Sequence, residues 1–186
     1  CAFCAFFIVE TAQAQNLAGT QITTTMGIDD GASCKIRVGT QQGGRIFRDG
    51  VSGSCPTKAC PGGFASANNA WDEFSFKNIV GTDVCITIDV DGGACQSTFN
   101  THGHVQTAPY VPPTGGGDFC TNNPSFLGDQ GGSGTNSFSV EVEGCEPFYL
   151  VFTNASGTIT NCEYSFTIQP DPLLDLRCGM DQVACI

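Results

Sequence analysis

Twelve cysteines in a chain of 186 residues are the feature that most restricts how this sequence can fold. A dense and even set of cysteines is typical of proteins that fold in an oxidising compartment, where disulfides form and persist. The other common use of cysteine, a zinc site, requires paired Cys-x-x-Cys knuckles or cysteine and histidine at fixed spacing. Only Cys1 and Cys4 have that spacing, and no second knuckle follows them. The cysteines therefore predict structural disulfides in a secreted, extracellular or cell-surface protein.

Short segments in which apolar and polar residues alternate recur along the chain, and a period of two is the pattern of a half-buried strand. These segments are residues 21–26, 35–38, 74–76, 84–90, 138–142 and 164–168. Residues 148–152 are continuously apolar, which predicts a central strand covered on both faces. Turns rich in Gly, Asn and Asp separate the segments. About eight short strands of this kind predict an all-β fold, an antiparallel β-sandwich of jelly-roll type.

The sandwich is expected over residues 20–169 as one domain, because no strong linker interrupts that range. Residues 1–19 and 170–186 are expected to be strand-forming extensions, since each is apolar and carries two cysteines. Residues 1–9 are interpreted as a retained apolar strand, although Ala12-Gln13-Ala14 resembles a signal-peptidase site. An apolar strand must pair with a sheet edge, because alone in water it aggregates.

The charge of the chain argues against nucleic-acid binding, and its hydropathy argues against a membrane span. The chain has 7 Lys and Arg against 18 Asp and Glu, a net charge of −11, and no basic stripe that would bind nucleic acid. No apolar run reaches the roughly 18 residues needed to span a bilayer. We therefore expect neither a nucleic-acid partner nor a membrane span.

No arrangement of residues in the sequence indicates an enzyme. The segments around Ser52 and Ser133 each lack a glycine of a nucleophile elbow, and no phosphate-binding glycine loop follows a strand. His102 and His104 are two residues apart and would share one face of a strand, as metal ligands do. The preferred interpretation places both histidines in a polar loop or at a sheet edge. We expect no catalytic residues and no cofactor.

Three acidic pairs are available in principle for acid–base or calcium chemistry. Asp29-Asp30 and Asp72-Glu73 are interpreted as turn and edge residues. Asp89-Val90-Asp91-Gly92 is similar to the start of a calcium loop, so Asp89 and Asp91 are calcium candidates. The third ligand and the distal Glu of an EF-hand are missing, however.

Aromatic residues and one tripeptide are candidates for contact with glycans. Trp71, Tyr110 and Phe119 are candidates for a platform that binds sugar, although the preferred interpretation places Trp71 in a core strand and the other two as loop staples. Asn154-Ala155-Ser156 is the only acceptor tripeptide with a permitted middle residue, so Asn154 is a candidate for glycosylation in a suitable host, although so short a motif is frequent by chance.

A family resemblance rests on several segments between residues 44 and 169. They are Gly44-Arg45-Ile46-Phe47-Arg48-Asp49-Gly50, Cys55-Pro56-Thr57-Lys58-Ala59-Cys60-Pro61-Gly62, residues 71–78 and 84–88, Phe119-Cys120-Thr121-Asn122, Leu127-Gly128-Asp129, Phe138-Ser139-Val140 and residues 162–168. Together these segments resemble bacterial prepeptidase-C-terminal-like (PPC-like) β-sandwich modules. The resemblance implies a secreted accessory or adhesive module without catalytic activity. Cys145 and both cysteine-bearing ends depart from the pattern of that family.

Disulfide connectivity is not determined by cysteine positions alone. The inner cysteines form an even set: Cys34, Cys55, Cys60, Cys85, Cys95, Cys120, Cys145 and Cys162. Cys55 and Cys60 flank a short turn and are expected to pair locally. The resemblance implies the pairs Cys85–Cys162 and Cys95–Cys120, which leaves Cys34 with Cys145. The terminal cysteines, Cys1, Cys4, Cys178 and Cys185, are available for bridges within the chain or to a neighbouring subunit.

The apolar ends have two possible uses, and both remain open. The ends can fold back and complete their own sandwich, or one end can enter the next subunit by β-strand addition and build a filament. We favour the second use, which predicts a homopolymeric subunit of an extracellular filament or surface appendage, assembled head to tail. The alternatives are a carbohydrate- or surface-binding adhesin module, for which Trp71 and Tyr110 would have to be exposed, and an accessory domain of a secreted hydrolase.

Overall fold

The computed structural model describes residues 15–66, 68–96, 100–155, 161–179 and 184–186. Within these ranges the chain forms twelve strands and two short helices: β1 (Gln21–Thr25), β2 (Lys35–Gly39), β3 (Gly44–Ile46), β4 (Gly63–Ala65), β5 (Trp71–Asn78), β6 (Val84–Asp91), α1 (Gly93–Gln96), β7 (Thr101–Gln106), α2 (Phe119–Asn122), β8 (Phe126–Asp129), β9 (Asn136–Val142), β10 (Pro147–Asn154), β11 (Glu163–Ile168) and β12 (Leu176–Cys178). The predicted all-β class is confirmed. No helix among the described residues has the length and hydrophobicity to cross a bilayer.

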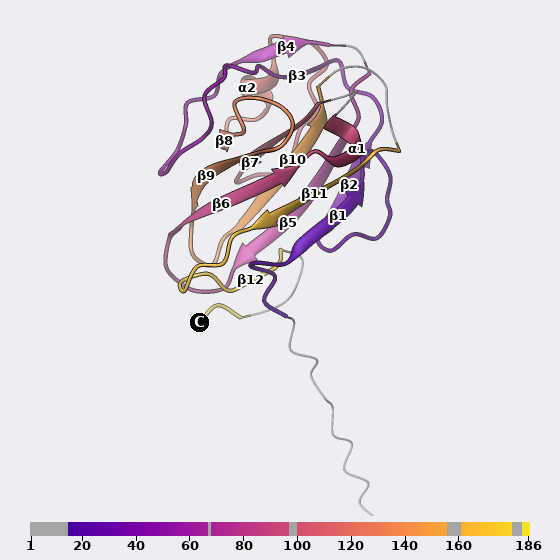
Figure 1. The fold of residues 1–186 in the computed structure, drawn as a ribbon. Helices are drawn as coiled ribbons and strands as arrows, with labels where there is room; N and C mark the ends of the chain where they lie inside the picture. The colour runs from indigo at the N-terminus through magenta and orange to yellow at the C-terminus, as the bar shows by residue number, and fades with distance from the viewer. Residues whose placement is uncertain (1–14, 67, 97–99, 156–160, 180–183) are drawn as a thin grey trace, which may run out of the picture.

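Two sheets pack face to face, and every strand pairing in them is antiparallel (Figure 1). The first sheet has the order β1-β11-β6-β9. The second has the order β12-β5-β10-β7-β8, and β2 pairs with the same edge of β5 as β12. Strands β3 and β4 form a separate two-stranded ribbon. The predicted antiparallel β-sandwich is therefore confirmed.

The main hydrophobic core lies between the two sheets and follows from the period-two patterns. Along β6, Val84, Ile86, Ile88 and Val90 are buried, whereas Cys85 is exposed. Aromatic rings meet across the gap: the Phe166 ring of the first sheet lies 4.9 Å, centroid to centroid, from the ring of Phe74 in the second. Edge-to-face contacts of this kind add to the stabilisation gained from burial alone.

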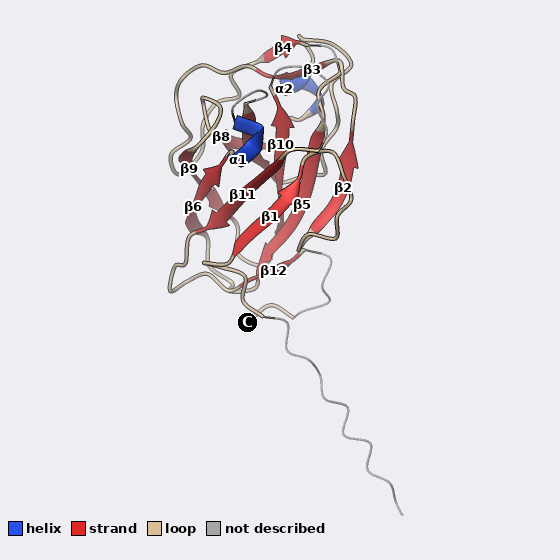
Figure 2. Cartoon of the chain, turned by 45° about the vertical axis from the view of Figure 1, so that its right-hand side comes forward, coloured by secondary structure: helices blue, strands red, loops and turns tan. Residues whose placement is uncertain are grey.

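Strand β10 is the central strand that the continuous apolar run predicts. It pairs with β5 on one side and with β7 on the other. Figure 2 labels β10 and its neighbour β5. Phe148, Leu150 and Phe152 belong to the main core, whereas Val151 belongs to a second hydrophobic cluster on the other face. Both faces of this strand are therefore covered.

The second cluster is buried by a cap of loops over the outer face of the second sheet. It consists of Ile46, Trp71, Tyr110, Phe119 and Val151. The cap contains the β3–β4 ribbon and α2, which lie at the end of the sandwich opposite the C-terminus (Figure 1). The sandwich thus has two buried layers, one between its sheets and one beneath the cap.

The interpretation of His102 and His104 as loop or edge residues is wrong. Both lie on β7, an interior strand between β10 and β8, and both are fully buried. Every residue of β7 is buried, although the strand reads Thr-His-Gly-His-Val-Gln and has a single large aliphatic residue. A strand with so few apolar side chains gives no alternation signal. Its polar face is nevertheless buried, because the cap covers it.

Five disulfides join the described residues: Cys34–Cys178, Cys55–Cys85, Cys60–Cys120, Cys95–Cys162 and Cys145–Cys185. Every predicted pair is wrong: Cys55–Cys60, Cys85–Cys162, Cys95–Cys120 and Cys34–Cys145 are not formed. A bridge requires Cα atoms about 4.4–6.8 Å apart, and here they lie 4.9 to 6.0 Å apart. Neighbours of Cys55 contact β9 whereas those of Cys60 contact α2, so the loop carries the two cysteines to different partners. Cys1 and Cys4 lie outside the described residues.

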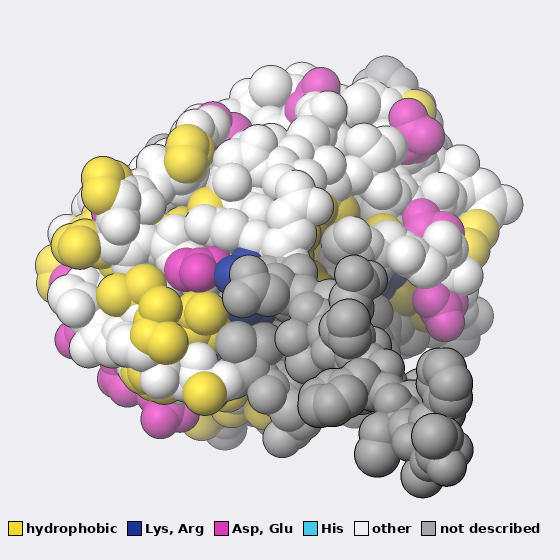
Figure 3. All heavy atoms as spheres, turned by 90° about the horizontal axis from the view of Figure 1, so that it is seen from below, with side chains coloured by type: hydrophobic (Ala, Val, Ile, Leu, Met, Phe, Trp, Pro, Cys, Tyr) yellow, Lys and Arg dark blue, Asp and Glu magenta, His cyan; other side chains and the backbone are white. Residues whose placement is uncertain are grey.

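The described part of the C-terminal segment folds back onto its own chain. In β12, Leu176 and Cys178 pair with Asn78 and Phe76 of β5. The main-chain N–H of Ile186 donates to the Ile79 carbonyl over 2.8 Å. Figure 3 shows this end of the molecule, where hydrophobic side chains gather on one side. Residues 1–14 are outside the described ranges, and a head-to-tail filament stays a prediction.

Candidate functional site

The predicted aromatic platform is buried, so a sugar site on its surface is ruled out. Trp71 is 7% exposed, Tyr110 1% and Phe119 0%. The rings of Trp71 and Tyr110 meet edge to face with centroids 5.3 Å apart. The Tyr110 N–H donates to Glu73 Oε1 over 2.6 Å. The preferred interpretation of these aromatic residues as core and loop staples is confirmed.

The predicted glycosylation of Asn154 is contradicted by its burial. Asn154 is 1% exposed, its main-chain N–H donates to the Ala70 carbonyl, and its carbonyl accepts from Asn69 Nδ2 over 2.6 Å. An N-linked glycan requires an accessible asparagine amide. A motif of three residues occurs often by chance. Whether its asparagine is accessible depends on the strand pairing of the folded chain.

The acidic pairs differ in environment. Asp30 is a turn residue as expected and accepts from the Thr25 N–H over 2.6 Å. Asp72 and Glu73 are fully buried on β5, contrary to the edge interpretation. Asp72 lies 3.3 Å from Lys35 Nζ, and Glu73 forms an ion pair with Arg37. Burial raises the pKa of Asp72 to about 6, although Lys35 and the Tyr164 hydroxyl lower it.

The calcium candidates accept hydrogen bonds from neighbouring side chains and backbone. Asp89 accepts from the Ser137 hydroxyl over 2.5 Å. Asp91 accepts from the Gly93 N–H over 3.0 Å and from the Thr135 hydroxyl over 3.3 Å. In the described ranges, no three His, Cys, Asp or Glu side chains gather as a metal site would require. Calcium at this position stays a prediction.

A pocket of about 470 Å³ opens where three loops of the cap meet, and the sequence did not point to it. Its lining is uncharged: Gln41, Gln42, Gly43, Ser66, Asn68, Pro112, Pro113 and Thr114. The Gly43 N–H donates to the Pro113 carbonyl over 2.9 Å, and the Ser66 N–H donates to the Gly43 carbonyl over 3.4 Å. A Cβ on Gly43 would lie 2.0 Å from the Thr114 carbonyl oxygen, so only glycine permits this approach. The loops that form the pocket are therefore fastened to one another.

Gln42 contributes an amide of which only the oxygen has a hydrogen-bond partner among the described residues. Its side chain is buried, and Oε1 accepts from the Tyr110 hydroxyl over 2.8 Å. Its Nε2 has no hydrogen-bond partner among the described residues. A buried donor without a partner costs about 1–3 kcal/mol. A hydroxyl group that reached this amide would remove part of that cost.

Two phenylalanine rings are exposed at the β3–β4 ribbon: Phe64 lies on β4, and Phe47 directly follows β3. Phe47 is 43% and Phe64 45% exposed, and their ring centroids lie 6.5 Å apart. The Arg45 guanidinium lies 4.5 Å from the centroid of Phe64. Arg45 is buried and donates to the carbonyls of Ala155 and Ile46 over 3.0 and 2.9 Å. Burial lowers the pKa of Arg45 to about 10, so the guanidinium is charged at neutral pH.

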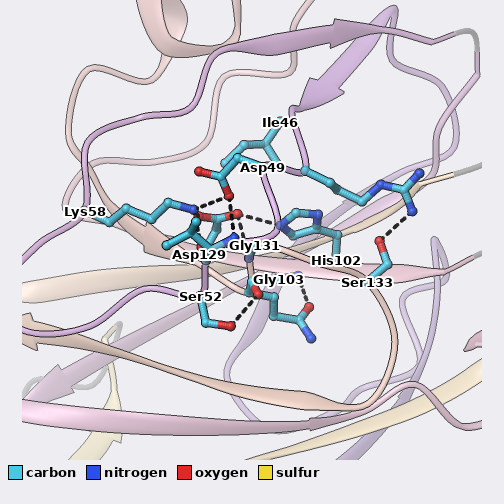
Figure 4. A network of polar contacts seen from close by, with 12 residues as sticks. Ile46, Asp49, Ser52, Lys58, His102, Gly103, Asp129, Gly131 and Ser133 are labelled. Carbon is cyan, nitrogen blue, oxygen red and sulfur yellow. Dashed lines mark hydrogen bonds and ion pairs between the residues drawn. The ribbon is translucent and has the colours of Figure 1, made fainter.

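A polar network holds the loop that follows Phe47 against the second sheet (Figure 4). Its centre is the buried carboxylate of Asp129, which lies 2.7 Å from Lys58 Nζ and 2.8 Å from His102 Nε2. Lys58 also contacts Asp49 over 2.7 Å. Burial raises the pKa of Asp129, but the hydrogen bonds from His102 and Lys58 outweigh this and lower it overall. None of these residues lines the pocket, so the network serves to position the loop.

We expect His104 to make the stability of the protein depend on pH. Its ring lies 5.1 Å from that of Phe119 and 5.4 Å from that of Tyr110, centroid to centroid, and its nitrogens have no hydrogen-bond partner among the described residues. Burial, helped by nearby His102, lowers the pKa of His104 from 6.5 to about 3. Below pH 6.5 the unfolded chain therefore binds a proton that the folded chain does not. His104 contributes stability above pH 6.5 that is lost as the pH falls towards 3.

We expect the free energy of unfolding to fall by about 2 kcal/mol between pH 7.5 and pH 5 because of His104. Denaturant titrations at both pH values measure this difference. The variant His104→Leu has no imidazole to protonate, so its loss over the same range should be smaller by that amount. An equal loss in the variant and the wild type would show that His104 is not the group responsible.

Comparison with known proteins identifies no family for this chain. No family model matches it, and no curated protein matches it. Among solved structures, similarity is found to one described as Xyl-CBM35 in complex with a glucuronic-acid-containing disaccharide, with a TM-score of 0.37 and 15% identity over 86% of this chain and 99% of the other. A second, CBM35 from Cellvibrio japonicus Abf62, has a TM-score of 0.32 and 15% identity over 84% of this chain and 97% of the other. Similarity at this level assigns neither a family nor a ligand to the chain.

Proposed function

We propose that this protein is a secreted, non-catalytic module that binds a neutral carbohydrate in the pocket of the cap. The observation that carries the proposal is the lining of that pocket. Amide and hydroxyl side chains supply both donors and acceptors, which a ligand rich in hydroxyl groups requires. Pro112 and Pro113 add apolar surface for the C–H groups of a sugar ring. The lining therefore combines several uncharged polar groups with a small apolar surface.

Charge supports a neutral ligand over an acidic one. None of the residues that line the pocket is charged, and the chain as a whole carries a net charge of −11. A protein of this charge repels anions through its long-range field. An anionic sugar would therefore enter without a cationic partner in the lining and against an unfavourable potential.

The remaining features support secretion and the absence of catalysis. Five disulfides are what an oxidising compartment maintains. The buried titratable groups His102, His104 and Asp129 lie beneath the cap, in packed surroundings, and do not line the pocket. A general acid or base must come within hydrogen-bond reach of the substrate.

The variant Gln41→Ala tests the proposal, because Gln41 is exposed and lines the pocket. We expect affinity for neutral oligosaccharides, measured by isothermal titration calorimetry, to fall roughly tenfold through loss of one or two hydrogen bonds. Asn68→Gly should act similarly and preserve the backbone, since Asn68 has φ of 61°, which glycine adopts readily. Gln15→Ala, at another exposed glutamine outside the pocket, is the matched control and should bind like the wild type.

A glycan array with calorimetry at millimolar ligand decides the outcome. Binding to neutral saccharides that Gln41→Ala weakens and Gln15→Ala leaves unchanged would support the pocket. The proposal fails if no neutral saccharide binds, or if acidic saccharides bind and both glutamine variants retain their full affinity.

A further inference from the structure

The exposed phenylalanine pair is continuous with the pocket through the β3–β4 ribbon. In this ribbon Gly44 pairs with Ala65 and Arg45 with Phe64. The next residues, Gly43 on one strand and Ser66 on the other, line the pocket. Two residues along a strand span about 7 Å, so the attachment point of the Phe64 ring lies about one sugar unit from the pocket wall.

The ring of Phe64 is held in place before any ligand arrives. The buried guanidinium of Arg45 lies against it and is fixed by two main-chain carbonyls. A disulfide from Cys60 to Cys120 ties the segment before β4 to α2. The Gly62 N–H also points to Cys120 Sγ over 3.2 Å. A ring that is already rigid loses little conformational entropy when a ligand stacks on it.

Phe47 is anchored from the other strand of the ribbon. Its N–H donates to the Gly62 carbonyl over 3.0 Å, and the preceding residue, Ile46, is buried in the cluster beneath the cap. Asp49, two residues later, contacts Lys58 in the network around Asp129 (Figure 4). The fold thus uses buried charges and a disulfide to present two apolar rings to solvent, which by itself is unfavourable.

We propose that Phe64, supported by Arg45 and flanked by Phe47, forms a second subsite, so that the ligand is a neutral oligosaccharide of at least two units. One unit occupies the pocket, and the next stacks its C–H face on the exposed phenyl rings. This inference rests on the proposed function and adds the length of the ligand and the place where it leaves the pocket. Two half-exposed rings offer far less area than a stable protein interface buries, which favours a sugar over a protein partner.

Calorimetry with neutral gluco-, manno- and xylo-oligosaccharides of one to six units tests the inference on the intact protein. For the saccharide that binds, affinity should rise about tenfold from one unit to two or three. The variant Phe64→Ala should lose this rise and keep the affinity for a single unit. Phe64→Trp should restore it, since any aromatic ring can stack. Leu173→Ala removes a side chain of similar exposure, 49%, from the C-terminal segment and should change nothing.

Failure of the second subsite and failure of the proposed function give different results. If single units and longer chains bind equally, or if Phe64→Ala weakens both to the same extent with unchanged thermal stability, the second subsite is overturned and the pocket stands. If no neutral saccharide binds, the proposed function and the subsite both fall. If sedimentation velocity shows a dimer that Phe64→Ala dissociates, and affinity does not depend on chain length, the rings serve self-association and the subsite is overturned.

Discussion

Replacing Cys60 and Cys120 together by alanine is expected to lower the free energy of unfolding by about 4 kcal/mol and to abolish saccharide binding. The bridge closes a loop between residues 60 apart in sequence, and a disulfide stabilises mainly by restricting the unfolded chain. It also joins the segment before β4 to α2, and both partners pack against the cluster beneath the cap. Without it, the segments that continue into two of the pocket loops, with Ser66 and Asn68 after β4 and residues 112–114 before α2, lose their covalent cross-link. Guanidinium titration without reductant measures the stability, and calorimetry the binding.

Removal of Cys34–Cys178 is the matched control. This bridge spans 144 residues, but the bridges Cys55–Cys85 and Cys95–Cys162 shorten the path around its loop to roughly 50 residues, so its loss should also cost about 4 kcal/mol. It ties β12, which lies at the end of the molecule opposite the cap (Figure 1), to the residue that precedes β2. Cys34→Ala with Cys178→Ala should therefore bind saccharides as the wild type does, at temperatures where the variant is folded. Equal binding by both double variants would show that the pocket does not depend on the Cys60–Cys120 bridge.

Asp129→Asn is expected to lower the free energy of unfolding by about 3 kcal/mol, because breaking a buried ion pair leaves a buried charge without its partner. Asp129 is fully buried and holds both Lys58 and His102. An asparagine of the same shape keeps the volume but loses the charge, and its amide nitrogen would face groups that already donate. The measurement is a denaturant titration at pH 7.5, where burial keeps His102 neutral.

Asp49→Asn is the matched control. It tests whether the contribution of Asp129 comes from its burial or only from its contact with Lys58. Asp49 approaches Lys58 Nζ at the same distance as Asp129, 2.7 Å, but its side chain is 28% exposed. Exposed ion pairs contribute about 0–1 kcal/mol, so this variant should lose less than 1 kcal/mol. If the two variants were equally destabilised, burial of Asp129 would not be the reason for its contribution.

Strands with alternating side chains were predictable because their pattern is local. Residues 84–90 and 164–168 carry the period of two that burial of one face imposes, and both appear as strands, β6 and β11. Strand β7 escaped prediction because its outer face carries His102, His104 and Gln106. These polar side chains are buried only because the cap, from distant parts of the chain, folds over them.

The aromatic residues illustrate the same limit for the site. The sequence leaves Trp71 and Tyr110 available both for a sugar platform and for the core, and the structure shows that both are buried. Phe47 and Phe64, which are exposed, were not singled out, since nothing in a sequence marks which phenylalanine a cap leaves uncovered. Gln41 and Gln42 gave no signal either, because amides are common in loops of every kind.

The sequence by itself determined the all-β class, the antiparallel sandwich, the central position of residues 148–152 and the use of cysteine for disulfides. Each of these follows from composition or from the period of side chains along a single segment. Tertiary structure alone decided which cysteines pair, that β12 closes the edge of β5, and that three loops meet around a pocket. These features depend on distances between residues far apart in the chain, and those distances exist only once the two sheets and the cap have packed.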